Sequence, residues 1–129
     1  MRPPALERWH AIAKSRDAAG LETLLAEDVV FHSPVVHTPQ RGKAITATYL
    51  TAALAIFGET FRYGGEWIGE TSAVLEFFAT IDGIEIDGAD FIGWNAAGQI
   101  DSFKVMVRPL KAIGVVHQAM GARLAKPGD

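Results

Sequence analysis

Asp90 is the residue whose surroundings in the sequence most favour chemistry. It lies in the run from Ile84 to Trp94, which has the composition of a β-strand, and alternation places Asp90, Ile92 and Trp94 on one face. A carboxyl group surrounded by apolar side chains has a raised pKa, because burial disfavours its charged form. Such a group can act as a base, as an acid or as a neutral hydrogen-bond donor. A solvated or hydrogen-bonded aspartate with a structural role is the alternative interpretation.

A serine and two histidines near a proline-containing loop form the second group of candidates. His37 lies in the loop from Pro34 to Gly42, and His32 and Ser33 directly precede that loop. A histidine can transfer protons near neutral pH, and His37 is the better placed of the two, although a structural or solvated role fits both. Their spacing matches no metal-binding motif, so no metal is expected. Ser33 has no neighbouring base, which favours a hydrogen bond to a ligand over nucleophilic attack.

Aromatic side chains supply the candidate wall of a binding pocket: Trp9, Tyr49, Phe77, Phe103 and Trp94. Packing in the hydrophobic core is the default explanation for each of them. Trp67 could line either the pocket or a dimer interface. His117 lies beside Val116 on the last predicted helix, a pattern that favours a packed structural histidine over a ligand contact.

Composition excludes several classes of function. The chain has 129 residues, a formal net charge of −3 and no cysteine, which removes disulfides and thiolate chemistry. The Lys and Arg residues are scattered, so no nucleic-acid partner is expected. No apolar run approaches the roughly 18 residues of a membrane span, and the first ten residues do not resemble a signal peptide. We therefore expect a cytoplasmic protein whose partner is a small apolar molecule or another protein.

The elements that must position these residues follow from periodicity and turn signals. Helices are predicted over residues 4–16, shortly after Asp17, over 43–57, and from Leu110 to Leu124. Strands are predicted over 29–33, 61–68, 73–81, 84–94 and 100–107, and a frayed tail over 126–129. Helices that are segregated from an antiparallel sheet indicate an α+β fold. We expect a single domain over residues 1–129.

Several short segments resemble one known family. The order of LLAEDVVFHSP, the loop SPVVHTPQRG at 33–42, the hairpin DFIGWNAAGQI at 90–100 and the segment VMVRPL resembles the nuclear transport factor 2-like superfamily. Within it, the chain is most similar to the SnoaL-like and ketosteroid isomerase branch. The resemblance implies a cone, in which a curved mixed or antiparallel sheet and the N-terminal helices, with a C-terminal helix, enclose one pocket. It also implies homodimers that pack through their sheets.

Matching the catalytic residues of that branch gives a mixed result. The aspartate base of the isomerase falls on Ser33, its oxyanion-hole tyrosine on Trp9, and its second oxyanion-hole acid on Asp90. Serine has no carboxylate and indole is a far weaker acid than phenol, so the standard ketosteroid isomerase mechanism is not expected. The arginine of the epoxide-hydrolase branch falls on Gly88. A SnoaL-type pairing of Asp90 with a histidine stays open.

Together these features predict a small-molecule-binding protein of uncertain catalytic status. One hypothesis is a cofactor-independent isomerase, dehydratase or cyclase, an isomerase or lyase acting on a small apolar oxygenated compound. Asp90 and His37 would then be catalytic, and the ligand would contact Trp9, Ser33, Tyr49, Phe77 and Phe103. The alternative is a noncatalytic ligand-binding or dimerisation module of the same fold.

Overall fold

The computed structural model describes residues 2–125, so the predicted tail at 126–129 lies outside it. The elements along the chain are α1 (Pro4–Ser15), η1 (Ala18–Gly20), α2 (Leu21–Leu24), β1 (Leu25–His32), β2 (Gln40–Arg41), α3 (Lys43–Phe57), η2 (Gly58–Thr60), β3 (Arg62–Ile68), β4 (Ser72–Ile81), β5 (Ile84–Trp94), β6 (Ile100–Arg108) and α4 (Leu110–Leu124). Two details differ from the prediction. β1 begins at Leu25, and the loop after it contains the short strand β2, because Val30 and Phe31 pair with Arg41 and Gln40.

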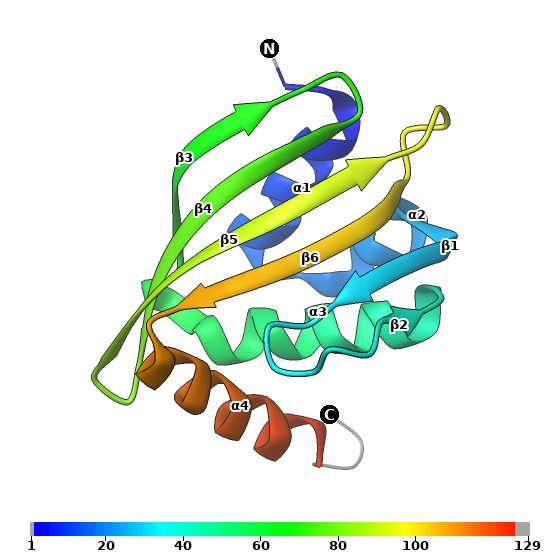
Figure 1. The fold of residues 1–129 in the computed structure, drawn as a ribbon. Helices are drawn as coiled ribbons and strands as arrows, with labels where there is room; N and C mark the ends of the chain where they lie inside the picture. Colours follow the sequence, from blue (N-terminus) through cyan, green and yellow to red (C-terminus); the bar gives the residue numbers. More distant parts are fainter. Residues whose placement is uncertain (1, 126–129) are drawn as a thin grey trace.

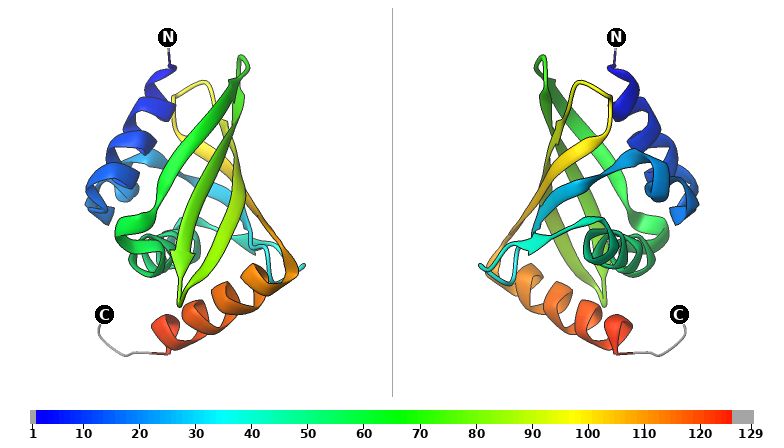
Figure 2. Two further views of the ribbon diagram at one scale, coloured as in Figure 1. Left: turned by 90° about the vertical axis from the view of Figure 1, so that its left-hand side faces the viewer. Right: turned by 90° about the vertical axis from the view of Figure 1, so that its right-hand side faces the viewer.

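The strands form one curved sheet in the order β2-β1-β6-β5-β4-β3. β1 pairs with β6 in parallel, and every other neighbouring pair is antiparallel. Figures 1 and 2 show the sheet bending around α1 and α3, while α4 crosses below α3 at the end of the β4–β5 hairpin. The predicted α+β fold with a cone-like sheet against helices is therefore confirmed.

Alternation along the strands separates an inner from an outer face of the sheet. On β4 the inner positions are fully buried, among them Leu75 and Phe77, while the outer positions between them are only half-buried. The inner side chains form two packed clusters. One surrounds α1 and includes Trp9 and Phe103. The other joins α3 and α4 and includes Phe57. Residues of both clusters line one cavity, which is where a site can form.

α1 is fixed to the sheet by packing and by polar contacts. Pro4 occupies its first position, where the missing N–H costs nothing, and residues at helical spacing bury one face. The helix ends at Arg16, whose left-handed backbone directs its N–H to the Ile12 carbonyl oxygen at 2.7 Å. These contacts hold Trp9 against β3 and β6. Each helix in the described part of the chain is too short or too polar to cross a membrane.

Candidate functional site

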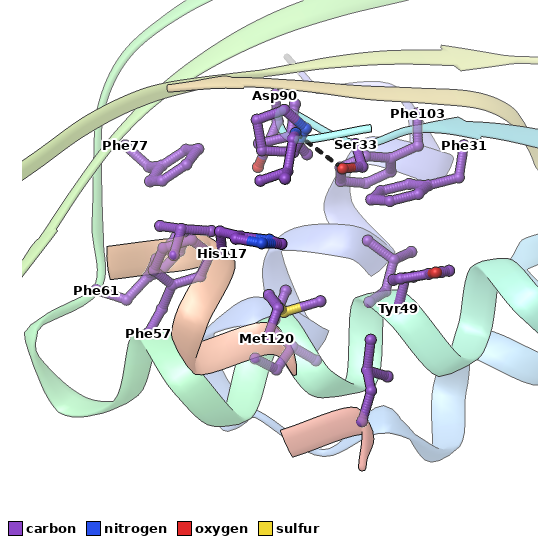
Figure 3. A pocket seen from close by; sticks show the side chains of 18 of the residues that line it. Phe31, Ser33, Tyr49, Phe57, Phe61, Phe77, Asp90, Phe103, His117 and Met120 are labelled. Atoms are coloured by element: carbon purple, nitrogen blue, oxygen red, sulfur yellow. Dashed lines mark hydrogen bonds between the residues drawn. The ribbon is translucent and has the colours of Figure 1, made fainter. Parts of the chain in front are cut away.

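A cavity of about 210 Å³ lies between the inner face of the sheet and the helices. Its wall is almost entirely apolar, with a few polar groups converging on it (Figure 3). The sheet supplies one wall, α1 and α3 a second, and α4 the third. The lining includes Trp9, Arg16, Phe31, Ser33, Tyr49, Phe57, Phe61, Phe77, Asp90, Phe103, Val105, Val116, His117 and Met120. Small-molecule sites commonly combine such an apolar wall with a few fixed polar groups.

Asp90 is the only charged residue among those buried within 2–125. It stands at the centre of the sheet, between Leu75 of β4 and Val105 of β6, and 5 % of its surface is exposed. The alternation of β5 directs it inward together with Ile92, as the sequence predicted. Its Oδ2 accepts a hydrogen bond of 2.5 Å from the hydroxyl of Tyr63.

Burial dominates the electrostatics of this pair. Desolvation raises the pKa of Asp90 to about 7, although the hydrogen bond from Tyr63 opposes the rise. Burial, followed by the nearby Asp90, raises the pKa of the Tyr63 phenol well above its ordinary value. Tyr63 therefore keeps its proton near neutral pH and donates a hydrogen bond to Asp90. The Asp90 carboxyl changes its charge near neutral pH, where it can give or take a proton.

A chain of hydrogen bonds from α1 to β5 orients these groups. Trp9 Nε1 donates to the Tyr63 hydroxyl at 2.8 Å, and Tyr63 donates in turn to Asp90. The Trp9 indole also packs edge-on against Phe103, with ring centroids 4.9 Å apart. The indole N–H is thus used inside the protein, although Trp9 still lines the cavity.

Tyr63 is the functional residue that the sequence analysis missed. It is paired with Phe77 across β3 and β4, which places it on the inner face. Part of the signal was available, because a buried tyrosine needs a partner for its hydroxyl and Asp90 was expected on the inner face. The obstacle was the irregular register between Tyr63 and Glu66, because Gly64 and Gly65 interrupt the alternation there.

An ionic cluster supports the same end of α1. Glu66 accepts hydrogen bonds from Arg2 Nε at 3.0 Å and contacts His10 Nε2 at 2.5 Å. Partial burial opposes the ionisation of Glu66, but the hydrogen bonds from Arg2 and His10 outweigh it and lower its pKa. The ring of His10 also packs edge-on against Tyr63, with centroids 5.2 Å apart. The cluster therefore braces the tyrosine from the side away from Asp90.

The remaining predicted ligand contacts also line the cavity, and each is held by different interactions within the protein. Ser33 Oγ accepts hydrogen bonds from the N–H groups of Val35 and Val36, at 3.0 and 3.1 Å, and so shapes the loop. Tyr49 stacks against Phe31, with centroids 5.7 Å apart and planes 14° from parallel. Both residues, with Phe77 and Phe103, are cavity residues in Figure 3.

Gly88 shows why one aromatic ring can lie flat on the sheet. A Cβ atom at this position would lie 2.2 Å from Cζ of Phe77. The ring therefore occupies the space above Gly88, two residues before Asp90 on the same inner face. No side chain fits there without moving Phe77, which agrees with the absence of an arginine at this position.

Four of the candidate residues do not line the Asp90 cavity, and one unexpected residue does. His32 and His37 line a neighbouring shallow cleft with Lys104, outside the Asp90 cavity. Trp94 packs against the α1 cluster, and Trp67 is 61 % exposed on the outer face. His117 lines the cavity, although the sequence pattern favoured a packed structural role. Within residues 2–125, no three His, Asp or Glu side chains gather closely enough to hold a metal ion.

Known proteins similar to this chain share its fold over nearly the full length. A steroid delta-isomerase from Pseudomonas aeruginosa is 36 % identical, with a TM-score of 0.90 and coverage of 94 % of this chain and 89 % of that chain. An uncharacterised bacterial protein with a cystatin-like fold from Silicibacter pomeroyi is 31 % identical, with a TM-score of 0.87 and coverage of 94 % and 85 %.

A more distant similarity concerns the fold alone. SalBIII, an epoxide hydrolase/cyclase-like enzyme in pyran ring formation in the polyether salinomycin, is 18 % identical, with a TM-score of 0.62 and coverage of 80 % of this chain and 86 % of that chain.

A search among curated proteins gave no match. The family model for the SnoaL-like domain matches residues 6–103. The chain therefore belongs to the SnoaL-like domain family, and the predicted superfamily is confirmed.

Proposed function

We propose that this member of the SnoaL-like domain family catalyses acid–base chemistry on a small, apolar, oxygen-bearing molecule. The reaction class is isomerisation, dehydration or cyclisation without a cofactor, because acid–base catalysis by side chains can promote each of them. One observation carries the proposal. Asp90, 5 % exposed, lies in the wall of an apolar cavity and has a pKa of about 7. Perturbed carboxyl groups in clefts are typical of acid–base sites.

The geometry suggests a role for each polar group. The cavity holds the apolar body of the substrate, and its oxygen atom lies against Asp90. In its neutral form, Asp90 donates a hydrogen bond to that oxygen and stabilises the negative charge that develops there. Tyr63 holds the other carboxyl oxygen, and Trp9 holds Tyr63. The hydroxyl proton of Ser33 remains free for the ligand, because Ser33 Oγ only accepts its two backbone hydrogen bonds.

The similarity to a steroid delta-isomerase at 36 % identity supports the isomerase class. Ser33 and Trp9 occupy the positions where the resemblance implies an aspartate and a tyrosine, so the standard mechanism does not transfer directly. Tyr63 of β3 places a phenol between Trp9 and Asp90, where it donates its hydrogen bond to Asp90 and not into the cavity. The substrate is therefore a ketone or related compound of a size set by this cavity.

A noncatalytic binding module is the second candidate. The observation in its favour is that the Trp9 N–H and the Ser33 oxygen already have partners inside the protein. Few polar groups then remain to act on a ligand. A module of this kind binds an apolar compound and releases it unchanged.

Proton exchange on a simple ketone separates the two candidates. The probe is 2-tetralone, a bicyclic ketone with acidic protons beside its carbonyl group, and proton NMR follows their replacement by deuterium in D₂O. We expect wild-type protein to accelerate the exchange and Asp90→Asn to lose most of the acceleration. The matched control is Asp87→Asn, the same change on the same strand at a position facing away from the cavity. Binding without accelerated exchange, for this ketone and for a 3-oxo-Δ⁵-steroid, would favour the module.

We also propose that the outer face of the sheet packs against a second copy of the chain. Trp67 and Met106 are 61 % and 51 % exposed there. Burial of large apolar side chains is the main favourable term in such association. Light scattering after gel filtration should give the mass of a dimer for wild type and of a monomer for Trp67→Glu. A monomeric wild type would remove this proposal without affecting the cavity.

A further inference from the structure

α4 closes the cavity opposite Asp90 and brings a histidine into it. Val116, His117 and Met120 of α4 line the cavity. Figure 3 shows the imidazole of His117 directed into the space below Asp90, between the aromatic group of Phe57 and Phe61 and the side of Tyr49. His117 is the only imidazole among the residues that line the cavity. It is exposed, and no hydrogen bond or ion pair within residues 2–125 occupies its ring.

When Asp90 acts as the hydrogen-bond donor, the cavity otherwise lacks a group that can take a proton from carbon. Ser33 lines the cavity, but it has no carboxylate to accept a proton. Arg16 has no lone pair to accept a proton, and Tyr49 is a phenol stacked on Phe31. A proton shift needs a base as well as the donor at Asp90. His117 is the cavity residue that can supply one.

We propose that His117 is the general base of the site and that it acts in concert with the donor Asp90. This inference rests on the proposed function and names its substrate class, ketones with a removable proton on the carbon beside the carbonyl group. A neutral imidazole nitrogen takes that proton. The electron pair of the C–H bond forms a carbon–carbon double bond, and the carbonyl π electrons move to oxygen, where Asp90 donates its hydrogen bond.

The reaction then closes without any further reagent. The imidazolium exchanges its proton with the solvent and delivers a deuteron to the same carbon, which gives exchange in D₂O. Alternatively, it returns the proton to a carbon two positions further along an unsaturated chain, which moves the double bond. The carbonyl group re-forms as charge leaves the oxygen. No electrons are gained or lost overall, and His117 and Asp90 end in their starting protonation states.

The pH dependence of the reaction depends on both groups. The titratable or charged side chains that line the cavity with His117 are Arg16 from α1, Tyr49 from α3 and Asp90 from β5. The active form has His117 unprotonated and Asp90 protonated, so the wild-type rate should rise and then fall with pH. Without His117 the rise on the acid side disappears, while the fall that follows the ionisation of Asp90 remains.

The test uses the full-length protein and the exchange of 2-tetralone in D₂O. His117→Gln keeps a polar side chain on an exposed helix position, and Gln118→Ala, the next exposed residue, controls for disturbance of α4. We expect His117→Gln to slow exchange by about 10²-fold or more, the range in which a general base contributes. The Kd for the ketone should stay within about twofold, Gln118→Ala should match wild type, and added imidazole should restore part of the rate to His117→Gly.

The outcomes distinguish the two proposals. Exchange that survives His117→Gln, or an acid limb that remains in its pH profile, would overturn the role of His117 while the proposed function stands. Loss of rate through weaker ketone binding alone would also overturn it, because a base acts on turnover. Failure of wild type to exchange any proton would refute the proposed function and this inference together.

Discussion

Replacing Asp90 with asparagine should change how stability depends on pH. The pKa of Asp90 lies at about 7 in the folded protein against an ordinary value of 3.8. Between these values the folded protein holds a proton that the unfolded chain has released. Stability therefore falls as the pH rises through this window and levels off above it. Asparagine carries no such proton, yet it can still accept the hydrogen bond from Tyr63.

The magnitude follows from the width of the window. Each pH unit between the two values costs about 1.4 kcal/mol. Across the window from 3.8 to about 7, wild type should lose about 4 kcal/mol of unfolding free energy relative to Asp90→Asn. Because Asp90 is only 5 % exposed, solvent screening takes little from this figure. Below the lower value both states are protonated, and the whole contribution is present.

Urea unfolding of both proteins, followed by far-ultraviolet circular dichroism at intervals from pH 4 to pH 8.5, measures the difference directly. Histidines and surface carboxyl groups are common to both proteins, so their titration cancels. The difference between the two curves should decline steadily and then flatten near pH 7. Parallel curves would show that burial does not hold the carboxyl neutral. A wild type that gained stability relative to Asp90→Asn as the pH rose would reverse the reasoning.

Three further changes test the surroundings of the site. Tyr63→Phe removes the hydrogen bond that favours ionised Asp90, so urea unfolding should show a loss of about 1–3 kcal/mol and a pH window that extends further upward; an unchanged window would contradict this. Gly88→Ala places a methyl group 2.2 Å from the Phe77 ring, which should lower stability by about 1–3 kcal/mol in the same assay, and a neutral result would mean that the ring moves freely. Thr46→Val removes a fully buried hydroxyl that has no partner within residues 2–125, so its midpoint in urea should rise by the equivalent of about 1 kcal/mol; a fall would indicate that the hydroxyl is satisfied.

The inward direction of Asp90 could be predicted because a strand has a fixed period. Once turn signals set the two ends of β5, alternation decides which of its residues share a face. The burial of Ile92 confirms that its face is the inner one. The same reasoning correctly placed Phe77 on β4. Helical spacing likewise gave the buried face of α1, including Trp9. Local rules therefore determined which face of each element turns inward.

Contacts between different helices and strands around the cavity could not be predicted in this way. Tyr63 of β3 reaches Asp90 of β5 across β4, and no local pattern reports that contact or the irregular register that follows Tyr63. His117 was assigned to packing by its spacing on α4, but the position of α4 across the cone leaves that side chain against the cavity. His37 shares a loop with Ser33, yet the turn that Ser33 caps leads it to another cleft.

The inner face of β5 carries one residue, Asp90, that lowers stability and is better explained by function. Ile86 and Ile92 are almost fully buried there, and a third isoleucine would continue the pattern at position 90. The chain instead buries a carboxyl group whose pKa of about 7 means that its ionised form is disfavoured by about 4 kcal/mol. It also provides two further side chains, Tyr63 and Trp9, to satisfy that group. Local departures of this kind, which folding alone does not require, are characteristic of functional sites, and here they converge on the wall that faces His117.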